Sequence, residues 1–546
     1  MKMSFHGIAA AAALSFLAIP AQGQAQAQGQ GSVAAAEPKV EVANFAVSGN
    51  TLLAPASIDA ALAPYRGRRS LAELKAAAAA VQALYVQAGY GGVIVYVPAQ
   101  DQAQPGVVQL TVVEARISRV VITGNQRDST AAVLKSVPRL KAGTTPETQR
   151  LDAQIALANQ NPARQLAVTL EPGAAQGEVE ARVAVTEQPE RRWAVSVDNT
   201  GNSQTGRSRA NLAMQQANLF GTDDSLSLLA QMAPQKPGAV AVISAGLRAP
   251  LYDAGLVLDL MAAWSDVDGG TTSTAAGPLQ FSGKGRVAGL RLSGALPRQG
   301  DFSHRIGAGI DYRAYLNQCS ITGLPEGACG SSGESVAVSP FSIEYQAQWN
   351  GPNPIAVQLS YSANTGLFGS HSGAASIDAV RPGAPLNYKV LRLNGLAQFN
   401  LPGALQGWQI GLRIAGQDTG SALVPGEQFG LGGANAVRGY EEREVTGDRA
   451  FFGSGELRGP NLGSAEGWVR NLQFIAFGDA GRVWNHLGTA CMGTQTMCSL
   501  ASVGVGARLG GGPWGLKLDL AESLKAGTAT GRHKTFLHVQ ASYEFQ

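Results

Sequence analysis

From Arg192 to the end of the chain, apolar residues alternate with polar or small ones in one segment after another. Clear examples are Leu256–Trp264, Trp408–Ala415 and Trp514–Ala521. Successive side chains of a β-strand point to opposite faces, so a period of two gives each strand one apolar and one polar face. The pattern covers about 355 residues, which predicts a large, mainly β domain over residues 190–546.

Composition indicates which kind of β domain this is. Charged residues make up 15% of the chain, against about 25% in a typical soluble protein. No internal run of 18 apolar residues occurs, which excludes a transmembrane helix. A soluble β-sandwich alternates in the same way, but the low charge and the length of the pattern favour a membrane barrel with an apolar outer face and a polar lumen. We count about sixteen strands, so the predicted fold is an antiparallel transmembrane β-barrel preceded by two small α+β domains.

The connections between these strands alternate between short and long, as periplasmic turns and extracellular loops do in bacterial barrels. The long ones are expected near residues 266–280, 317–334, 366–386, 419–448 and 485–500. All four cysteines lie in long connections, and we expect local disulfides Cys319–Cys329 and Cys491–Cys498 in an oxidising compartment. A cysteine metal site is the alternative, but the six histidines are scattered and supply no matching ligands.

The N-terminus has the features of an export signal. Lys2 is followed by the apolar stretch Ile8–Ile19, and Ala25–Ala27 offers a small-residue cleavage site. We therefore expect a signal peptide over residues 1–27 and a short flexible segment over residues 28–39.

Residues 40–188 contain an internal repeat. The segment Phe45–Asn50 is echoed by Val120–Asn125, and both end in Gly-Asn, which suits a turn. Each copy continues with a helix and two strands; the first helix, Leu71–Ala88, begins with a capping box of Ser70 and Glu73. The repeat predicts two α+β domains, over residues 40–115 and 116–188. They are either structural spacers or modules whose exposed sheet edges accept an extended chain.

The most informative loop sequence is Gly430–Tyr440, in the connection 419–448. Its one cation is Arg438, and its glycines allow tight turns and close approach. About forty residues later, Asp479 lies on the polar face of the strand-like segment Phe474–Trp484. Because an enclosed arginine needs a carboxylate, we expect Arg438 to pair with Asp479. On spacing alone, a solvated arginine and an unrelated aspartate are equally compatible.

The sequence offers no catalytic arrangement. It has no nucleophile elbow between a strand and a helix, no pair of carboxylates that can be positioned for acid–base work, and no His/Cys metal spacing. The glycines before Arg438 are not followed by the Gly-Lys-Ser/Thr of a phosphate loop. We therefore expect no enzyme activity, no cofactor, no metal and no nucleic-acid partner.

Several of these features resemble a known family. The sequence Val437, Arg438, Gly439, Tyr440 resembles the VRGY signature of the TpsB transporters (FhaC/ShlB/HecB family), in the superfamily that includes BamA. Phe477, Asp479 and Gly481 resemble the strand motif that receives the loop arginine. The two α+β domains resemble POTRA domains, Asp198–Gly201 resembles the family's barrel start, and the last strand ends in an aromatic residue, Phe545, as barrel assembly signals do.

The resemblance implies a two-partner secretion transporter of the bacterial outer membrane. POTRA domains in the periplasm would bind an unfolded exoprotein, such as an adhesin or haemolysin, and the barrel would pass it to the surface. The connection 419–448 would be a loop folded into the lumen, and the expected partners are the exoprotein, outer-membrane lipid and the barrel-assembly machinery that inserts the chain. The segment 28–39 is too short for the plug helix of many relatives, which argues against plug gating. The alternatives are an assembly factor like BamA or TamA, a passive porin and a surface adhesin. The presence of two modules, where assembly factors have three or five, argues against the first, and a porin has no need of periplasmic modules. An adhesin would need an exposed passenger domain, which we do not find in the sequence.

Overall fold

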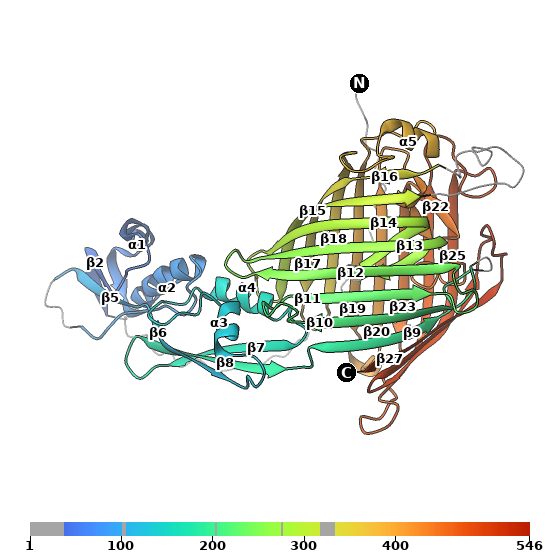
Figure 1. Ribbon diagram of the computed structural model, residues 1–546. Helices are drawn as coiled ribbons and strands as arrows, with labels where there is room; N and C mark the ends of the chain where they lie inside the picture. The colour runs from blue at the N-terminus through green and yellow to red at the C-terminus, as the bar shows by residue number, and fades with distance from the viewer. Residues whose placement is uncertain (1–37, 101–104, 203–204, 275–276, 317–333, 546) are drawn as a thin grey trace, which may run out of the picture.

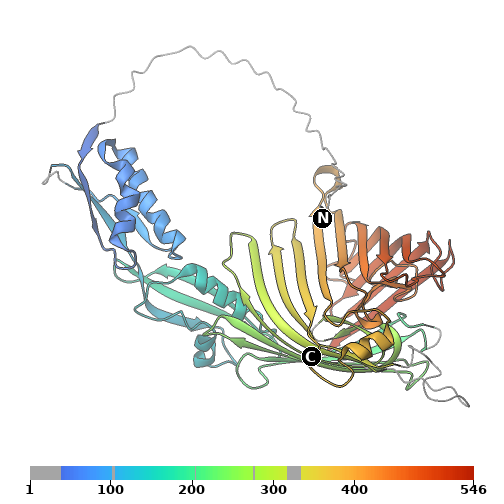
Figure 2. The ribbon, with the colours of Figure 1, turned by 90° about the horizontal axis from the view of Figure 1, so that it is seen from above.

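The computed structural model describes residues 38–100, 105–202, 205–274, 277–316 and 334–545. Figures 1 and 2 show two small modules that follow one another away from one end of a barrel. The first module contains β1 (Lys39–Val42), β2 (Asn44–Ser48), α1 (Pro55–Leu62), η1 (Ala63–Tyr65), β3 (Gly67–Ser70), α2 (Leu71–Gln87), β4 (Ile94–Tyr96) and β5 (Val107–Val113). Its main sheet has the order β2-β5-β4, and β1 pairs with β3.

The second module repeats the plan of the first. It contains β6 (Arg116–Thr123), α3 (Thr130–Ser136), α4 (Thr148–Ala158), β7 (Arg164–Pro172) and β8 (Glu178–Glu187), with the sheet order β6-β8-β7. The capping box of Ser70 and Glu73 opens α2 as predicted. Helices α1 and α3 were not predicted from the sequence, because helices of eight and seven residues are too short to show a clear period.

The Gly-Asn repeat marks equivalent turns in the two modules. Gly49 and Gly124 have φ values of +84° and +85°, and a Cβ on either would lie 2.1 or 2.3 Å from a carbonyl oxygen of the neighbouring strand. Only glycine fits this combination of backbone conformation and close approach. Each turn is also bound by a carboxylate at the end of the last strand, Glu114 in the first module and Glu187 in the second.

Glu114→Gln is expected to loosen the turn of the first module at neutral pH. Burial raises the pKa of Glu114, but hydrogen bonds from Thr51, Tyr85 and the Leu52 amide outweigh it and hold the pKa below its usual value. A carboxyl group with a lowered folded pKa stabilises the fold above its unfolded pKa, and this stability is lost as pH falls through the folded pKa. Hydrogen exchange at residues 50–53 should show a loss of roughly 1–2 kcal/mol at pH 7. If wild type and variant exchange alike at pH 7, the carboxylate does not hold the turn.

The barrel closes on itself with sixteen antiparallel strands within the described residues. They are β9 (Arg191–Asp198), β10 (Arg209–Ala217), β11 (Ser225–Met232), β12 (Val240–Leu251), β13 (Leu256–Thr274), β14 (Gly277–Ala295), β15 (Phe302–Leu316), β16 with β17 (Val336–Val338, Pro340–Trp349), β18 (Ile355–Asn364), β19 (Lys389–Asn400), β20 (Gln409–Asp418), β23 (Arg449–Arg458), β24 (Asn471–Trp484), β25 (Met497–Gly511), β26 (Trp514–Ser523) and β27 (Thr535–Phe545). β16 and β17 both pair with β15 and are two pieces of one strand. The last strand pairs with the first, with Gln540 opposite Asp198 and Phe545 opposite Trp193, so the predicted barrel is confirmed.

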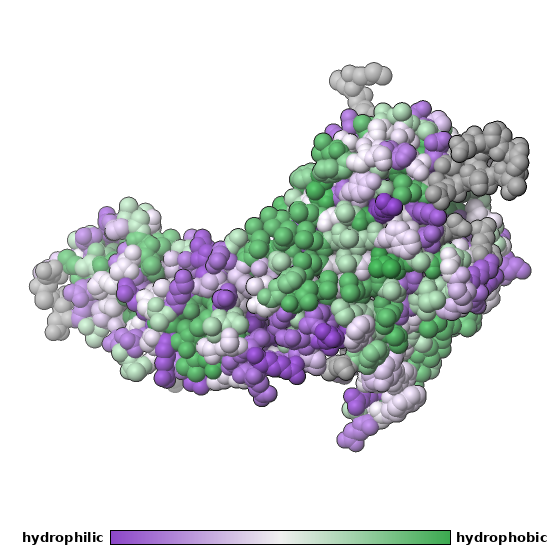
Figure 3. Space-filling model, viewed as in Figure 1, coloured by the Kyte–Doolittle hydropathy of each residue, from purple (hydrophilic) through white to green (hydrophobic). Residues whose placement is uncertain are grey.

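The two faces of the strands differ as the alternation predicts. In β18, Leu359 and Tyr361 are exposed on the outside, whereas Gln358, Ser360 and Ser362 line a cavity inside the barrel. Figure 3 shows apolar side chains gathered over the outer face of the barrel strands. No helix among the described residues is long and apolar enough to cross a membrane.

One predicted connection is wrong. The sequence analysis placed a long loop near residues 266–280, but β13 runs to Thr274 and β14 begins at Gly277, with an irregularity between Val267 and Gly270. This segment contains three threonines, whose β-branched side chains favour extended backbone. The segment that was expected to be a loop therefore belongs to a long strand pair.

A buried arginine joins the second module to the barrel. Arg164 is 1% exposed, and its guanidinium donates to Asp128 of the module and to Asp223 of the turn between β10 and β11. Tyr252, in the turn between β12 and β13, donates to the same Asp223 at 2.7 Å. Asn161 adds a hydrogen bond to Asp223 at 3.0 Å. These contacts fix the module against two turns at one end of the barrel.

Arg164→Met is expected to free the second module from the barrel. The change keeps side-chain volume but leaves two carboxylates without their cation, which costs about 3 kcal/mol in a buried pair. Distances between spin labels on the second module and on the barrel should broaden, while the barrel itself stays folded. The matched control is Arg119→Met on β6, because Arg119 pairs with Glu180 of the same module and an exposed ion pair of this kind contributes little. An unchanged distance distribution in Arg164→Met would contradict this role.

Candidate functional site

The connection between β20 and β23 folds into the barrel. It contains η4 (Pro425–Glu427), and its two arms pair as β21 (Phe429–Leu431) and β22 (Val445–Gly447). Leu431, Val437 and Tyr440 are fully buried, whereas a loop in solvent exposes most of its side chains. They pack with residues of β23, β24 and β25 in one hydrophobic cluster. The loop is therefore a packed element against the wall.

The side chain of Arg438 lies against Asp479 of β24. Its Nε donates to Oδ2 at 2.7 Å, Nη2 donates to Oδ1 at 2.8 Å, and the Arg438 amide donates to Oδ2 at 3.1 Å. Nη1 donates to Glu456 of β23 at 2.7 Å, and Nη2 donates to Ser454 at 3.2 Å. The guanidinium also lies 3.4 Å from the ring centroid of Phe477.

The hydrogen bonds around Arg438 and Asp479 compensate the two charges of this buried ion pair. Arg438 is 2% exposed and Asp479 is 3% exposed. Taking two charges out of water is costly, so such a pair adds little net stability, but it fixes position because any displacement leaves both charges unpaired. The bidentate geometry adds directionality. The pair therefore holds the loop tip at one place on the wall.

Two glycines, one in the loop and one on the wall, allow the loop to lie close against the barrel strands. Gly439, with φ of +88°, faces β26, where a Cβ would lie 3.2 Å from the Cβ of Ala521. Gly481 lies on β24, and a Cβ there would lie 2.4 Å from Leu431 of the loop. A side chain at Gly481 would therefore displace the loop from the wall.

The tip also contacts the strands next to the barrel closure. The Tyr440 hydroxyl oxygen lies 2.8 Å from the carbonyl oxygens of both Ala501 and Lys525, which share its single proton. The Gly439 amide donates to Nε2 of His538 on β27 at 2.9 Å. Through these contacts the four motif residues engage the wall from β23 to β27.

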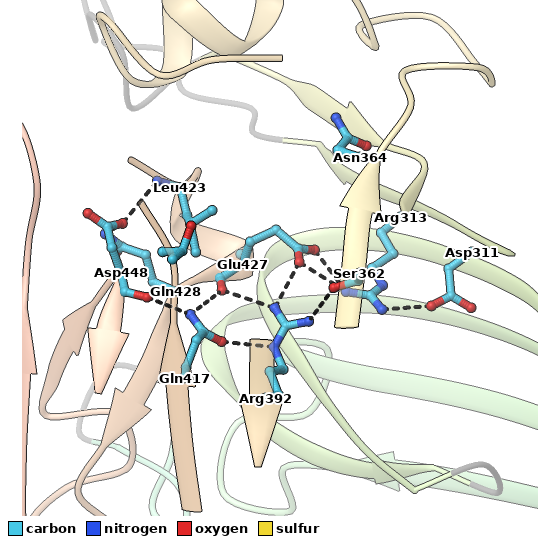
Figure 4. Close-up of polar contacts among 12 residues, drawn as sticks. Asp311, Arg313, Ser362, Asn364, Arg392, Gln417, Leu423, Glu427, Gln428 and Asp448 are labelled. Atoms are coloured by element: carbon cyan, nitrogen blue, oxygen red, sulfur yellow. Dashed lines mark hydrogen bonds and ion pairs between the residues drawn. The ribbon is translucent and has the colours of Figure 1, made fainter. Parts of the chain in front are cut away.

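A second group of charges holds the start of the loop. Glu427 is 2% exposed and accepts from Arg313 of β15 at 3.0 Å, from Arg392 of β19 at 3.2 Å and from the Tyr315 hydroxyl at 2.9 Å. Figure 4 shows Arg313 and Arg392 converging on this carboxylate from two strands of the wall. Gln417 of β20 donates to the Glu427 carbonyl at 3.1 Å.

A third contact fixes the end of the loop. Asp448, fully buried, accepts from Arg381 through both carboxylate oxygens, at 2.5 and 2.7 Å. Arg381 follows α5 (Ala374–Val380), in the connection between β18 and β19. The amides of Leu423 and His486 also donate to Asp448. The sequence analysis missed Glu427 and Asp448, and their only signal was a carboxylate near each end of an unusually long loop.

The second predicted cysteine pair is a disulfide in the structure. Cys491 and Cys498 are bonded, with their Cα atoms 6.1 Å apart. Cys498 is buried in the same cluster as Leu431, Val437 and Tyr440. Cys319 and Cys329 lie outside the described residues. Within the part of the chain that the structure describes, no group of three His, Cys, Asp or Glu side chains is placed to hold a metal ion.

Comparison with known protein families shows to which family this barrel belongs. The model of the haemolysin secretion/activation protein family ShlB/FhaC/HecB matches residues 180–509, and that of the ShlB-type POTRA domain matches residues 40–115. The chain belongs to the ShlB/FhaC/HecB family. It is therefore an outer-membrane β-barrel of a transporter family, with its POTRA modules in the periplasm.

Relatives of this ShlB/FhaC/HecB chain are transporters by name. The outer membrane transporter CdiB of Dickeya dadantii (strain 3937) is 24% identical over 415 residues, 74% of this chain and 68% of that protein. CdiB of Escherichia coli is 24% identical over 438 residues, 77% and 69% of the two chains.

Solved structures share the fold. CdiB from Escherichia coli has a TM-score of 0.76 at 20% identity, covering 95% of this chain and 93% of that one. CdiB from Acinetobacter baumannii has a TM-score of 0.72 at 17% identity, covering 94% and 91%. BamA from Haemophilus ducreyi lacking POTRA domains 1–3 has a TM-score of 0.50 at 14% identity, covering 92% and 100%. Because the POTRA modules of this family lie in the periplasm, the end of the barrel that carries them is its periplasmic end.

Proposed function

We propose that this chain is the transporter of a two-partner secretion system. It takes an unfolded exoprotein, called the client below, from the periplasm and passes it through the barrel to the cell surface. The observation that carries the proposal is the loop 419–448, which is held inside the barrel at its start, tip and end and leaves space beside it.

The space beside the loop has the chemistry of a polypeptide path. A cavity of about 760 Å³ lies between the loop and strands β11 to β20. Amides, hydroxyls and charged groups line it, among them Gln346, Gln358, Ser360 and Asn394. Such groups can exchange hydrogen bonds with the backbone of an extended chain, which has no secondary structure to satisfy its own amides.

The modules offer edges for capture of the client. In the first module, β4 lies at the edge of its sheet, and Ile94 and Tyr96 on it are exposed by 56% and 38%. In the second module, β7 lies at an edge, but the Asn159 side chain bonds both the amide and the carbonyl of Leu166 there. An extended client can add a strand to an open edge, so β4 is the better candidate. Structural spacing is the alternative role for both modules.

The proposal is tested by comparing the secreted, surface and outer-membrane proteins of a strain lacking this chain with those of its parent. Loss of one or a few large exoproteins, with other barrels at normal levels, is the expected result and identifies the client. Depletion of several unrelated outer-membrane barrels would instead assign the chain to barrel assembly. No change in either set would contradict both functions.

A further inference from the structure

A cavity with an excess of positive charge lies in the periplasmic half of the lumen, beneath the loop tip. Its volume is about 440 Å³, and Ala434 of the loop forms part of its lining. Its charged lining consists of Arg413, Arg438, Arg458, Arg508, Lys517 and Glu456. Arg458 is the last residue of β23, and the turn between β25 and β26 follows Arg508 closely. Both lie near the end of the barrel from which a periplasmic client enters.

The carboxylates around this cavity do not balance its cations. Arg438 is held by Asp479 and Glu456, and Arg458 shares Glu456 at 2.8 Å. Arg508 and Lys517 share Asp519, at 2.8 and 3.6 Å. Three carboxylates therefore form ion pairs with four of the five cations.

Arg413 is the cation that makes no direct contact with a carboxylate. Among the described residues it makes no hydrogen bond or ion pair, and its guanidinium lies over the Phe452 ring, 4.9 Å from the centroid. The side chain is half-buried and lines the cavity. A guanidinium without a hydrogen-bonded partner is costly in such an enclosed space, and a directly bound anion would relieve that cost.

We propose that this cavity binds carboxylate side chains of an extended polypeptide, so that the transporter engages acidic segments of its client before they pass the loop. The inference rests on the proposed function, since it names the chemistry that the lumen recognises. Guanidinium groups bind carboxylates through two parallel hydrogen bonds. Arg413 has donors free for this contact, and Lys517 lies across the cavity as a second, weakly paired cation. These groups lie on the lumen face of their strands, away from lipid headgroups.

The test measures peptide binding to the purified full-length chain in detergent by isothermal titration calorimetry. The probes are a 12-residue peptide of alternating Glu and Gly and its counterpart with Gln in place of Glu. The Glu peptide should bind, and the Gln peptide should bind at least about tenfold more weakly. If both bind equally, or the Glu peptide does not bind, the proposal is wrong.

Variants locate the binding. Arg413→Gln should weaken binding of the Glu peptide about tenfold, because one charge-assisted contact is lost, whereas Arg413→Lys keeps the charge but loses the bidentate geometry and should weaken binding by an intermediate factor of about three to five. Arg413→Gln leaves no carboxylate unpaired, so the barrel is expected to fold. Arg449→Gln is the control, because Arg449 is an exposed residue at the other end of β23 and pairs with exposed Asp418. If Arg413→Gln binds like Arg449→Gln, the site is not this cavity. Calorimetry measures binding without export. A negative binding result therefore contradicts the cavity proposal alone, whereas a negative deletion result contradicts the proposed transport function.

Discussion

Arg438→Ala is expected to lower export of the client to less than about a tenth of the wild-type level, while the amount of folded barrel changes little. The variant leaves Asp479 buried beside Phe477 with its guanidinium partner removed, and breaking a buried pair on one side costs about 3–5 kcal/mol. The loss destabilises the docked position of the loop tip and not the barrel, because the barrel strands are held by hydrogen bonds between their own backbone groups. The loop is then expected to leave its place on the wall.

The measurement is the secreted client per folded barrel, with the barrel followed by its heat-dependent mobility in gels. Arg482→Ala on β24 is the matched control, since its exposed side chain bonds Ser499 near the extracellular end and does not touch the loop. Normal export by Arg438→Ala at a normal barrel level would show that the tip contact is dispensable. Replacing both partners, as in Arg438→Met with Asp479→Leu, should recover folding stability and not export, which separates burial cost from function.

Glu427→Gln is expected to release the start of the loop. The variant keeps the volume of the side chain but removes the charge that Arg313 and Arg392 share. Arg313 keeps Asp311 at 2.6 Å, whereas Arg392 keeps only neutral partners such as Gln417. Amide exchange in residues 419–448 should rise about 100-fold, which corresponds to roughly 3 kcal/mol. Glu441→Gln, a like change at the loop tip outside this cluster, is the control and should leave exchange near wild type. Equal exchange in the two variants would show that the Glu427 cluster does not hold the loop.

The three buried contacts that hold the loop together limit how a client can pass through the barrel. The loop start is held by Glu427, the tip by Arg438 and the end by Asp448, each through a buried charge. Releasing the loop as one body requires all three contacts to break, whereas an extended chain can use the polar space along β11 to β20 without breaking any of them. We therefore expect the loop to stay in place during passage, as a fixed partition of the lumen.

The sequence was sufficient for the parts of the fold that rest on local pattern. Strand alternation predicted a closed barrel of about sixteen strands, and the helix predicted over Leu71–Ala88 is α2, which ends one residue earlier. Spacing alone left the pairing of Arg438 open, because an arginine in a loop and an aspartate on a strand carry no signal that they meet. The resemblance to the TpsB transporters supplied that signal for the tip.

Other contacts could not be predicted for physical reasons. Arg313 and Glu427 are 114 residues apart, and many lumen-facing positions carry polar side chains, so only the closed barrel shows which of them meet the loop. The junction at Arg164 depends on how the second module sits against two turns, which no local pattern encodes. The expected loop at residues 266–280 was wrong because a stretch of glycine, serine and threonine can form a long strand pair as well as a loop.

The most direct test of passage through the lumen is site-specific photo-crosslinking of a client stalled during export. The client identified by the deletion experiment is fused at its C-terminus to a stably folded domain, and a photoreactive residue replaces either Gln358 or Leu359. These neighbours on β18 point to the lumen cavity and to the outside, respectively. The account predicts crosslinks to the client from position 358 and none from position 359. Crosslinks from position 359 alone, or from neither position while the client remains bound to the modules, would contradict passage through the barrel.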